Sequence, residues 1–464
     1  MSTQPVSVVI LAAGLGTRMR TSLAKVLHHA GGACLLEHVI EAAEGVATPE
    51  RIVAVVGHQA ERVRAEVAAH PIRFETQTEQ LGTGHALRVC ACIEALQQGR
   101  VIVTYGDAPL LTVGTLQRLL AHHQESGCAA TVITTRVANP HGYGRIVRDA
   151  LGHVAAIVEQ KAATIEQQRI QEINSGMYCF EAALLWEHLA PLQPNPASGE
   201  IYLTDIVEAL RASGHPTAAY VVEDPTEVLG INTRIELADA DRIFRQRKTR
   251  ELMLGGVTIE LPETVIVDKH VRIGQDTILG PFTQILGRSV IGAECRIGAG
   301  SILNNVLVAD HVEINPYTLI DASTIEAGAH AGPFARLRMG ATLEAGAHVG
   351  NFVELKNTRL GAGSKSMHLA YLGDSTIGRK VNIGAGTITC NYDGAKKHPT
   401  AIGDGAFIGS NSTLVAPIEI GAGSYVAAGS TMTHVVPEDA LAFGRARQTV
   451  KPGWAKTRRE KLGK

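Results

Sequence analysis

Aromatic residues are scarce in this sequence of 464 residues: Phe, Trp and Tyr together make up 4% of the chain, against 48 glycines. A core built on large aromatic side chains is thereby excluded, and an architecture of small and β-branched side chains with tight corners is favoured. The composition is 45% hydrophobic and 19% charged, which is typical of a globular chain rather than a disordered one. At this length we expect two or more domains.

An excess of charge of either sign is also missing, since the formal net charge is −2. This excludes the broad basic surface of a nucleic-acid-binding protein, and we expect no nucleic-acid partner. The one basic run follows Lys451, near the C-terminus, and a solvated tail explains it at least as well as a binding role.

Paired cysteines and long apolar runs are absent as well. The seven cysteines show no CxxC spacing, which is typical of reduced thiols in a cytosol. The chain starts with MSTQPVSVVILAAG, which enters a strand without the charged region of a signal peptide. No apolar run reaches the length that is needed to span a membrane. We therefore expect a cytoplasmic protein with no membrane partner.

Two different periodicities divide the chain. Up to residue 231, short apolar runs such as VSVVILAAG and RVIVTYGD alternate with segments of helical periodicity. This βαβ pattern predicts a Rossmann-like α/β domain over 1–231, with a mainly parallel sheet and helices on both faces. The charged, helix-favouring residues that follow predict a linker helix over 232–251.

From residue 252 to residue 464, aliphatic residues recur every six positions. One run reads Ile273, Leu279, Ile285, Ile291, Ile297 and Leu303, mostly followed by Gly. Hexapeptide repeats of this kind predict a parallel β-helix, in which three short strands form one triangular coil and the aliphatic residue points inward. The known hexapeptide proteins are left-handed, and by that resemblance we expect a left-handed β-helix here.

The repeat places residues eighteen apart directly above one another, at the ~4.8 Å separation of neighbouring strands. Arg338 and Lys356 stand in this relation, each just after an inward aliphatic residue. Two stacked cations favour a phosphate group between them or in front of them. The alternative is a solvated face on which nearby acids such as Glu344 and Glu354 balance the two charges.

Small residues form a second column. Ser410 and Ala428 are eighteen apart, and Ala385 holds the same place in its own hexad. Such a column makes a shallow groove in which a long, thin ligand can lie, but tight corners also require small residues. From the residues alone, the corner requirement is the preferred explanation.

The six-residue period is interrupted twice, by LGAGSKSMHLAYLGD (360–374) and by TCNYDGAKKHPTA (389–401). Interruptions of a solenoid usually form loops on one face, often the binding face. The first holds His368, and an imidazole beside a phosphate site suits removal of a proton from an amine near neutral pH. Zinc binding is the rival use of histidine, but the helix region has no two histidines with four residues between them.

A glycine-rich segment, LAAGLGTRM (11–19), follows the first expected strand, where a nucleotide-phosphate loop belongs. It lacks the third glycine of a Rossmann fingerprint and the Gly-Lys-Ser/Thr of a Walker A motif. Gly14 and Gly16 allow the backbone to approach an anion, and Arg18 and Lys25 can neutralise a triphosphate. For a bare GxG, a plain strand–turn–helix bend is the better explanation.

Further motifs decide the interpretation. The N-terminal half resembles the sugar-1-phosphate nucleotidylyltransferases in the order and spacing of LAAGLGTRM, Lys25, QTEQLGTGHA, VTYGDAPLL, GYGRIV, EINSGMY and GINTR. The hexapeptide region adds KSMHLAYLGD and TCNYDG. With these segments, nearly the whole chain resembles the bacterial bifunctional N-acetylglucosamine-1-phosphate uridylyltransferases/glucosamine-1-phosphate N-acetyltransferases.

The resemblance implies an enzyme with two activities. It would transfer an acetyl group from acetyl-CoA to glucosamine-1-phosphate, and then a uridylyl group from UTP to N-acetylglucosamine-1-phosphate with release of pyrophosphate. The product, UDP-N-acetylglucosamine, feeds peptidoglycan and lipopolysaccharide synthesis. Mg²⁺ is the implied cofactor. The implied assembly is a homotrimer with acetyl-transfer sites between neighbouring β-helices.

Site residues follow from the resemblance, position by position. Those matching the uridine-nucleotide site are Leu11, Ala12, Ala13, Gly14, Arg18, Lys25, Gln77, Gly82, Thr83, Tyr105, Gly106, Asp107, Gly144, Glu159, Asn174 and Asn232, with Asp107 and Asn232 matching the magnesium ligands. In the β-helix, His368 matches the general base, and Arg338, Lys356, Tyr371 and Asn382 match ligands of glucosamine-1-phosphate. Residues matching acetyl-CoA contacts are Ala385, Asn391, Tyr392, Ser410, Ala428 and Arg445.

Two positions depart from the resemblance. Leu15 replaces the Lys usual in the glycine loop, and Ala24 replaces a Pro that is common before Lys25. The first change removes one cation near the phosphates and the second frees the backbone. We therefore expect an altered affinity for UTP rather than a loss of activity.

Two other functions compete with this interpretation. One is an enzyme of a single activity, whose β-helix serves only for oligomerisation or allosteric binding. A regulatory helix, however, needs neither His368 nor the stacked Arg338 and Lys356. The other is a non-catalytic sensor of nucleotide sugars, which the intact Lys25 and Asp107 argue against.

Overall fold

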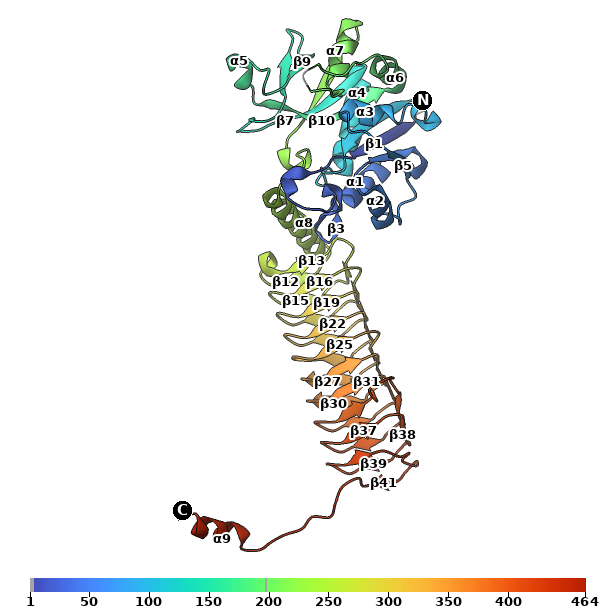
Figure 1. The fold of residues 1–464 in the computed structure, drawn as a ribbon, viewed down its shortest axis with the longest axis vertical. Coiled ribbons are helices and arrows are strands. Elements are labelled where there is room, and N and C mark those ends of the chain that lie inside the picture. Colours follow the sequence, from blue (N-terminus) through green and yellow to red (C-terminus); the bar gives the residue numbers. More distant parts are fainter. Residues whose placement is uncertain (1–3, 197) are drawn as a thin grey trace. The chain divides into compact units, whose positions relative to one another are not determined.

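The computed structural model describes residues 4–196 and 198–464. These residues form two compact units that divide between residues 244 and 245, inside helix α8 (Arg234–Leu254). Figure 1 shows a sheet with surrounding helices in the first unit and a stack of short strands in the second. Among the described residues, no helix is both long enough and apolar enough to cross a bilayer.

The first unit is built on a nine-stranded sheet in the order β11-β7-β10-β6-β1-β4-β5, with β8 and β9 attached beside β10. Its strands are β1 (Val6–Ala12), β4 (Ile52–Val56), β5 (Arg73–Thr76), β6 (Arg100–Tyr105), β7 (Ala130–Arg136), β8 (Arg145–Arg148), β9 (Val154–Val158), β10 (Glu172–Glu181) and β11 (Thr217–Val222). The pairs β1–β4, β1–β6, β4–β5 and β7–β11 are parallel, as the βαβ pattern predicted. β10 runs antiparallel to β6, β7 and β8, and β8 runs antiparallel to β9, so the sheet is mixed and not mainly parallel as predicted.

Helices cover both faces of this sheet because its central strand is apolar on both sides. In β1, Val8 and Ile10 belong to one core cluster, and Val9 and Leu11 belong to another on the opposite face. A strand buried on both faces reads as a continuous apolar run, which is why VSVVILA shows no alternation. The helices are α1 (Leu35–Glu44), α2 (Ala60–Glu66), α3 (Thr83–Arg88), α4 (Val113–Ser126), α5 (Ile165–Gln168), α6 (Ala182–Leu189) and α7 (Asp205–Ala212).

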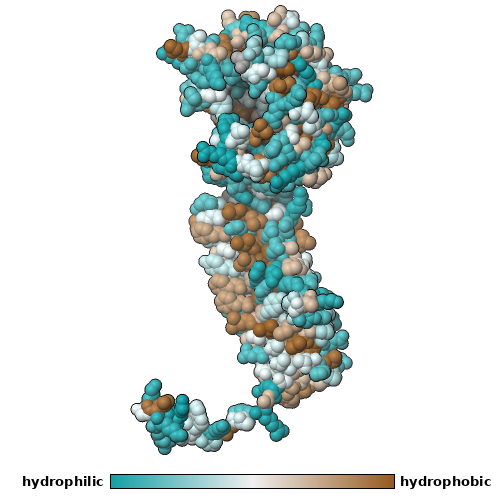
Figure 2. Space-filling model, in the orientation of Figure 1, coloured by the Kyte–Doolittle hydropathy of each residue, from teal (hydrophilic) through white to brown (hydrophobic). Residues whose placement is uncertain are grey.

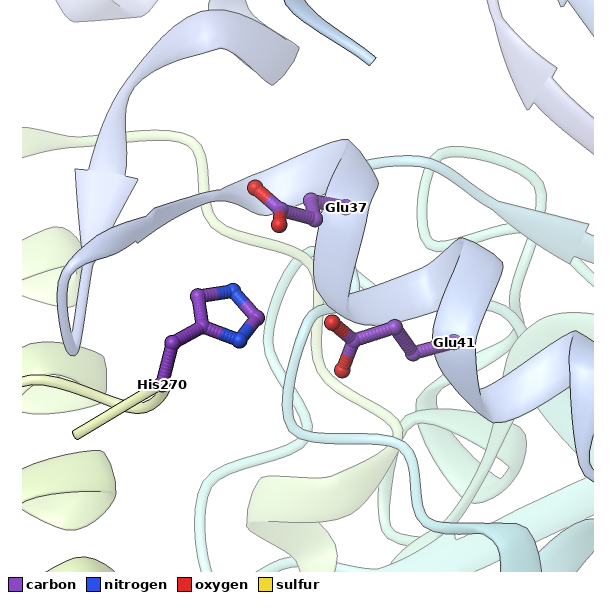
Figure 3. A group of neighbouring side chains, drawn as sticks. All are labelled: Glu37, Glu41 and His270. Carbon is purple, nitrogen blue, oxygen red and sulfur yellow. The ribbon is translucent and has the colours of Figure 1, made fainter. Parts of the chain in front are cut away.

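Helix α1 shows how the sequence sets these layers. Leu36, Val39 and Ile40 are fully buried in the core cluster. Glu37 and Glu41, which are one turn apart, project together from another side of the helix (Figure 3). This division of apolar and charged residues is the amphipathic pattern of a helix that packs on a sheet.

The start of α8 is fixed by a capping box. The Thr233 hydroxyl accepts the backbone N–H of Glu236 at 3.2 Å, and the Glu236 carboxylate accepts the N–H groups of Thr233 at 2.8 Å and Asn232 at 2.6 Å. Further along α8, the Phe244 ring stacks on His38 of α1 with centroids 3.9 Å apart. The first half of α8 is thus held to the first unit, and its cap fixes the backbone at Asn232.

The second unit is a parallel β-helix whose successive strands belong to three sheets. In the described residues, the first helix sheet has eleven strands, from β12 (Thr258–Ile259) to β41 (Leu441–Ala442). The second has ten strands, from β13 (Ile266–Val267) to β40 (Thr431–Met432). The third has nine strands, from β14 (Arg272–Ile273) to β38 (Ile418–Ile420). Each aliphatic residue of the hexapeptide period points inward, and together these residues form one continuous core. The prediction of a parallel β-helix from the six-residue period is confirmed.

The candidate site residues of the β-helix lie on or beside a limited set of its strands. In the first helix sheet they are β27 (His348–Asn351), β30 (Lys365–His368) and β33 (Asn382–Ile383). In the second they are β25 (Arg336–Arg338), β28 (Glu354–Lys356), β31 (Tyr371–Gly373), β34 (Ile388–Cys390) and β37 (Thr413–Val415). A short helix, α9 (Trp454–Lys461), lies near the C-terminus.

The first interruption of the period does not form the loop that we expected. Residues 365–368 form β30 and residues 371–373 form β31, both in register with the strands of the preceding coil. Ser366 takes the inward position that Val349 holds one coil earlier, and it is fully buried. The period is therefore broken in side-chain chemistry but not in backbone path. The second interruption does leave the sheets, between Cys390 and Thr400.

Aromatic side chains stack along one edge of the β-helix. The Phe334 ring lies between those of Tyr317 and Phe352, with centroids 5.4 and 5.5 Å away. All three occupy corners with positive φ, and each is about half exposed. Figure 2 shows hydrophobic surface along the coils of the second unit. An exposed apolar stack of this kind is unusual for a surface that meets only water.

Candidate active sites

The nucleotide-site candidates meet at the carboxyl ends of two parallel strands. Leu11 in β1 pairs with Tyr105 in β6, and the Gly106 N–H donates to the Leu11 carbonyl at 2.9 Å. The loops that follow lie side by side, where ligands bind in open α/β sheets. They line a cavity of about 350 Å³. Its walls include Leu11, Ala12, Ala13, Gly14, Lys25, Gln77, Gly82, Thr83, Tyr105 and Asp107, all expected from the sequence, and Gln80, Glu200 and Tyr202, which were not.

Four polar side chains converge beside this cavity. The Lys25 ammonium forms an ion pair with Asp107 and donates a hydrogen bond to Asn232 Oδ1 at 3.1 Å. Arg18 donates to the same oxygen at 2.7 Å. These bonds join Arg18 and Asn232, which are far apart in sequence, to the residues of the cavity. Two cations thus stand together where a triphosphate would need its charge neutralised.

The oxygens of Asp107 and Asn232 suit a hard divalent cation. Both contact the Lys25 ammonium, so a positive charge already lies between a carboxylate and an amide oxygen. Magnesium prefers oxygen ligands and takes only one or two of them from protein, with water and phosphate supplying the rest. The donor set therefore fits the ion that the resemblance implies.

Gly16 allows the loop to fold onto Lys25. Its φ is +63°, and a Cβ built there would lie 2.7 Å from the Lys25 Cβ, so glycine is required by conformation and by space. Leu15, beside it, has 53% of its surface exposed. Leu15 therefore packs weakly, and a longer polar side chain would fit at this position.

A second group of candidates lies together just before β8, just after β9 and in β10. The Asn174 N–H donates to the Gly144 carbonyl at 2.9 Å, and a Cβ at Gly144 would lie 3.2 Å from a Glu159 carboxylate oxygen. Burial, and then the charge of Asp205, raise the pKa of Glu159. Glu159 and Asp205 line a cavity of about 1070 Å³, which shares Tyr202 with the smaller cavity. The space next to the nucleotide candidates is thus large enough for a sugar.

In the β-helix, Arg338 and Lys356 are in direct register, as the eighteen-residue spacing predicted. Lys356 is only 6% exposed, so it does not lie on a solvated face. Arg338 Nε donates to Glu354 at 2.7 Å, whereas the Lys356 ammonium has Asp374 at 3.5 Å. Each cation is thus partly balanced by a carboxylate and keeps N–H groups for an anion.

Lys397 was missed by the sequence interpretation. It lies in the second interruption, within contact of Lys356, and that contact lowers the pKa of Lys397. The loop that carries it is held by Asp393, which accepts the N–H groups of Ala395 and Lys396 at 2.7 Å and contacts His398 Nε2 at 2.7 Å. Three cations therefore gather at one place. The sequence feature that could have indicated Lys397 is the pair of lysines inside a break in the six-residue period.

His368 ends β30, directly opposite Asn351 in β27. The His368 Nδ1 atom lies 2.8 Å from Asn351 Oδ1, and an amide oxygen can only accept, so Nδ1 carries the proton. The lone pair of Nε2 is then directed to the exposed side, as a general base requires. Tyr371 follows His368 across the corner, in β31, and Asn382 begins the next strand of the first helix sheet.

Among the described residues, His368 does not belong to a group of three His, Cys, Asp or Glu side chains close enough to share an ion.

The column of small residues exists as the spacing predicted. The Asn411 N–H donates to the Ala385 carbonyl at 2.7 Å, and the Gly429 N–H donates to the Ser410 carbonyl at 2.8 Å, which stacks Ala385, Ser410 and Ala428 in successive coils. Ser410 and Ala428 are exposed, so the column forms outer surface. Arg445 lies close to Gly429, beyond the last coils. Tyr392 is exposed in the second interruption, and Asn391 at its start is buried.

Comparison with known proteins gives the family. Residues 8–173 match the family of MobA-like NTP transferase domains, and residues 270–305 and 399–434 match the bacterial transferase hexapeptide repeats. The Bifunctional protein GlmU of Solibacter usitatus is 56% identical over 457 residues, which are 98% of each chain. That of Anaeromyxobacter sp. is 51% identical over 99% of this chain and 94% of its own, and that of Koribacter versatilis is 47% identical over 98% and 97%. The chain belongs to the GlmU family.

Membership of the GlmU family confirms the predicted fold class and the predicted pair of activities. The fold is an α/β nucleotidyltransferase unit followed by a left-handed parallel β-helix of hexapeptide repeats. The enzyme is bifunctional, with uridylyltransferase and acetyltransferase activities in the synthesis of UDP-N-acetylglucosamine. The rival interpretations, a single-activity enzyme and a non-catalytic sensor, do not fit a GlmU relative of this length and identity.

Proposed function

We propose that the second unit acetylates glucosamine-1-phosphate and that the first unit, with Mg²⁺, uridylylates the product. The observation that carries this proposal is the His368–Asn351 contact in the same coils as the Arg338, Lys356 and Lys397 cations or in the coils next to them. A base and a phosphate-binding cluster are the two elements that acylation of an amino sugar phosphate needs.

In the acetyl transfer, the amine nitrogen of glucosamine-1-phosphate attacks the thioester carbonyl of acetyl-CoA. His368 Nε2 takes a proton from the amine, the C–N bond forms, and the C–S bond breaks to release CoA. Arg338, Lys356 and Lys397 hold the phosphate, while Tyr371 and Asn382 contact the sugar. The acetyl-CoA chain lies along the small-residue column and contacts Ala385, Asn391, Tyr392, Ser410, Ala428 and Arg445.

In the uridylyl transfer, a phosphate oxygen of N-acetylglucosamine-1-phosphate attacks the α-phosphorus of UTP, and the bond to pyrophosphate breaks. Arg18 and Lys25 neutralise the phosphates, and Glu159, Asn174 and Gly144 hold the N-acetyl sugar. The remaining expected residues of the cavity hold the uridine. Asp107 and Asn232 would bind Mg²⁺, which supplies further charge neutralisation on the phosphates.

Three chains are proposed to assemble through the β-helix. The exposed stack of Tyr317, Phe334 and Phe352 supports this, since association would remove its rings from water. A reducing compartment, the cytoplasm, is proposed because each of the seven cysteines lies in the described part of the chain and is free. Analytical ultracentrifugation of the parent and of Phe334→Glu tests the assembly: a trimer that the substitution dissociates is expected, and a monomeric parent would refute it.

Mass spectrometry of one mixture tests both half-reactions. The mixture contains the protein, glucosamine-1-phosphate, acetyl-CoA, UTP and magnesium, with His368→Ala and Lys25→Ala as matched variants of the two units. The parent is expected to make UDP-N-acetylglucosamine. His368→Ala should make none until N-acetylglucosamine-1-phosphate is supplied, and Lys25→Ala should accumulate that intermediate. Failure of the parent to acetylate the sugar would overturn the proposed role of the β-helix.

A further inference from the structure

Asp374 lies at the corner after β31, between two amide side chains of the neighbouring coils. One carboxylate oxygen accepts the Asn357 amide N–H at 2.8 Å, and the other accepts the Asn391 amide N–H at 2.5 Å. The three residues are seventeen apart in sequence, so each stands one coil above the last. The result is a short hydrogen-bonded ladder parallel to the helix axis.

The same carboxylate faces Lys356. The Lys356 ammonium is 3.5 Å from Asp374, and both side chains are largely buried, with 7% and 16% of their surface exposed. At this distance Asp374 attracts the ammonium mainly by charge, through a long contact. The ammonium has three N–H groups, so with Asp374 and Lys397 as its neighbours it still keeps one for a phosphate.

Charge at this place is unbalanced without Asp374. Lys356 is stacked on Arg338 and contacts Lys397, and Glu354 is already engaged by Arg338. Among the described residues, Asp374 is the carboxylate recorded within ion-pair distance of Lys356. Because like charges at close range favour loss of a proton, two contacting lysines keep both charges only with an opposite charge beside them, and Asp374 supplies that charge.

We propose that Asp374 is a positioning residue for acetyl transfer, which holds the Lys356 ammonium at the phosphate site and, through Asn391, fixes the start of the loop that carries Lys397. Asp374 touches neither substrate and acts through these neighbours. This role rests on the proposed function of the β-helix. It joins the phosphate-binding residues to an acetyl-CoA candidate, so one carboxylate orders the binding of both substrates.

Electrostatics agree with this geometry. The contact with Lys397 and the charge of Asp374 raise the pKa of Lys356. Burial raises the pKa of Asp374, but the hydrogen bonds from Asn357 and Asn391 and the charge of Lys356 bring that pKa below its usual value. The carboxylate is therefore ionised throughout the neutral and alkaline range in which the enzyme can be assayed.

Asp374→Asn removes the charge but preserves the size of the side chain. An amide can also keep both rungs of the ladder if one neighbouring amide turns over. The matched control is Asp310→Asn, because Asp310 joins successive coils in a similar way, by accepting the Ala293 N–H at 2.7 Å, away from these residues. A merely structural role predicts the same behaviour for both variants.

The test is the KM for glucosamine-1-phosphate from about pH 6.5 to about pH 9, at saturating acetyl-CoA. At a given pH the substrate has the same ionisation state with the parent and with each variant. The ratio of variant KM to parent KM therefore reports a change in the protein alone. For Asp374→Asn we expect this ratio to rise by about fivefold or more across the range, as the contacting Lys356–Lys397 pair loses a proton that the Asp374 charge helps to hold. For Asp310→Asn the ratio should stay flat. The double variant Asp374→Asn/Lys356→Arg should also be flat, because a guanidinium keeps its charge.

Asn357→Ala provides a second route, should the first variant fold poorly. It keeps the charge of Asp374 but removes one rung of the ladder, so that the carboxylate is free to turn and bind the Lys356 ammonium more closely. The KM for glucosamine-1-phosphate should rise by about twofold or more with no dependence on pH. A flat, unchanged ratio in Asp374→Asn, or an unchanged KM in Asn357→Ala, would overturn the inference. A parent without acetyltransferase activity would instead refute the proposed function, before any variant is compared.

Discussion

His368 Nδ1 and Asn351 Oδ1 lie 2.8 Å apart, on paired residues of neighbouring strands of the β-helix. The contact places the imidazole proton on Nδ1 and turns the Nε2 lone pair outward. Because β27 and β30 are parallel and in register, the scaffold itself holds the two side chains together. The tautomer of the proposed base is thus set by the stacking of coils.

Asn351→Ala is expected to lower the kcat of acetyl transfer by about tenfold or more, because the neutral imidazole loses the partner that selects its tautomer. The KM for glucosamine-1-phosphate should change little, since Asn351 is not among the phosphate-binding residues. Steady-state kinetics of both half-reactions measure this, and uridylyl transfer is the internal control. An Asn351→Ala enzyme with the parent kcat would show that the contact does not orient the base.

Leu15→Lys is expected to lower the KM for UTP by about two- to fivefold, since it adds a cation beside Arg18 and Lys25 in the glycine loop. The exposed Leu15 side chain leaves room for the longer residue. Leu15→Met, which is similar in size and uncharged, is the matched control. An unchanged KM for Leu15→Lys would mean that this position does not sense the nucleotide phosphates.

Removal of divalent cations with EDTA is expected to separate the two activities. Formation of UDP-N-acetylglucosamine should stop. Asp107 and Asn232 offer two oxygens to Mg²⁺, and the lysine that contacts both oxygens cannot replace the ion in catalysis. Acetyl transfer should continue, because protein cations hold its phosphate. Added Mg²⁺ should restore the first activity. Loss of acetyl transfer in EDTA would point to a metal requirement in the β-helix.

Two neighbouring histidines with tilted rings are expected to make the β-helix sensitive to acid. The rings of His330 and His348 are 4.4 Å apart, and burial, the charge of His330 and that of Lys365 lower the pKa of His348. A histidine whose pKa is lowered on folding contributes stability that is fully present above its unfolded pKa and is lost as the pH falls below it. The loss should therefore set in below about pH 6.5.

His330→Gln tests this, because it removes the neighbouring charge; it also removes the contact of His330 with Glu313. The difference in Tm between about pH 7.5 and about pH 5.5 should shrink by about 1–2 °C in the variant, a small effect because both rings are partly exposed. His311→Gln, at an exposed contact with Glu294, is the control. Equal differences in the parent and His330→Gln would rule out the His330–His348 pair as the acid-sensitive feature.

The sequence alone specified the β-helix, because its information is local. One aliphatic residue in six sets the inward position of each strand, and the length of a coil then sets which residues stack. The register of Arg338 with Lys356 and the column of Ala385, Ser410 and Ala428 follow from counting. The loop after β1 was also evident, since strand, glycine and cation occur within a short segment.

Contacts between segments of unrelated spacing were decided by the tertiary structure. Arg18 and Lys25 meet Asn232 only because the cap of α8 fixes a backbone more than two hundred residues away. β10 lies antiparallel to its neighbours in a mixed sheet, and no local period encodes that pairing.

The first interruption of the period shows most clearly what the sequence decided and what the tertiary structure decided. Its polar residues predicted a binding site, but its backbone stays in the sheets, because Ser366 is small enough to point inward in place of an aliphatic residue. Coils of seventeen rather than eighteen residues then bring His368 opposite Asn351 and Asp374 between Asn357 and Asn391. The six-residue period of the sequence determined the scaffold. The packing of the corners determined which side chains meet. A hydrogen bond requires an exact register between two coils, and a six-residue repeat gives that register only approximately.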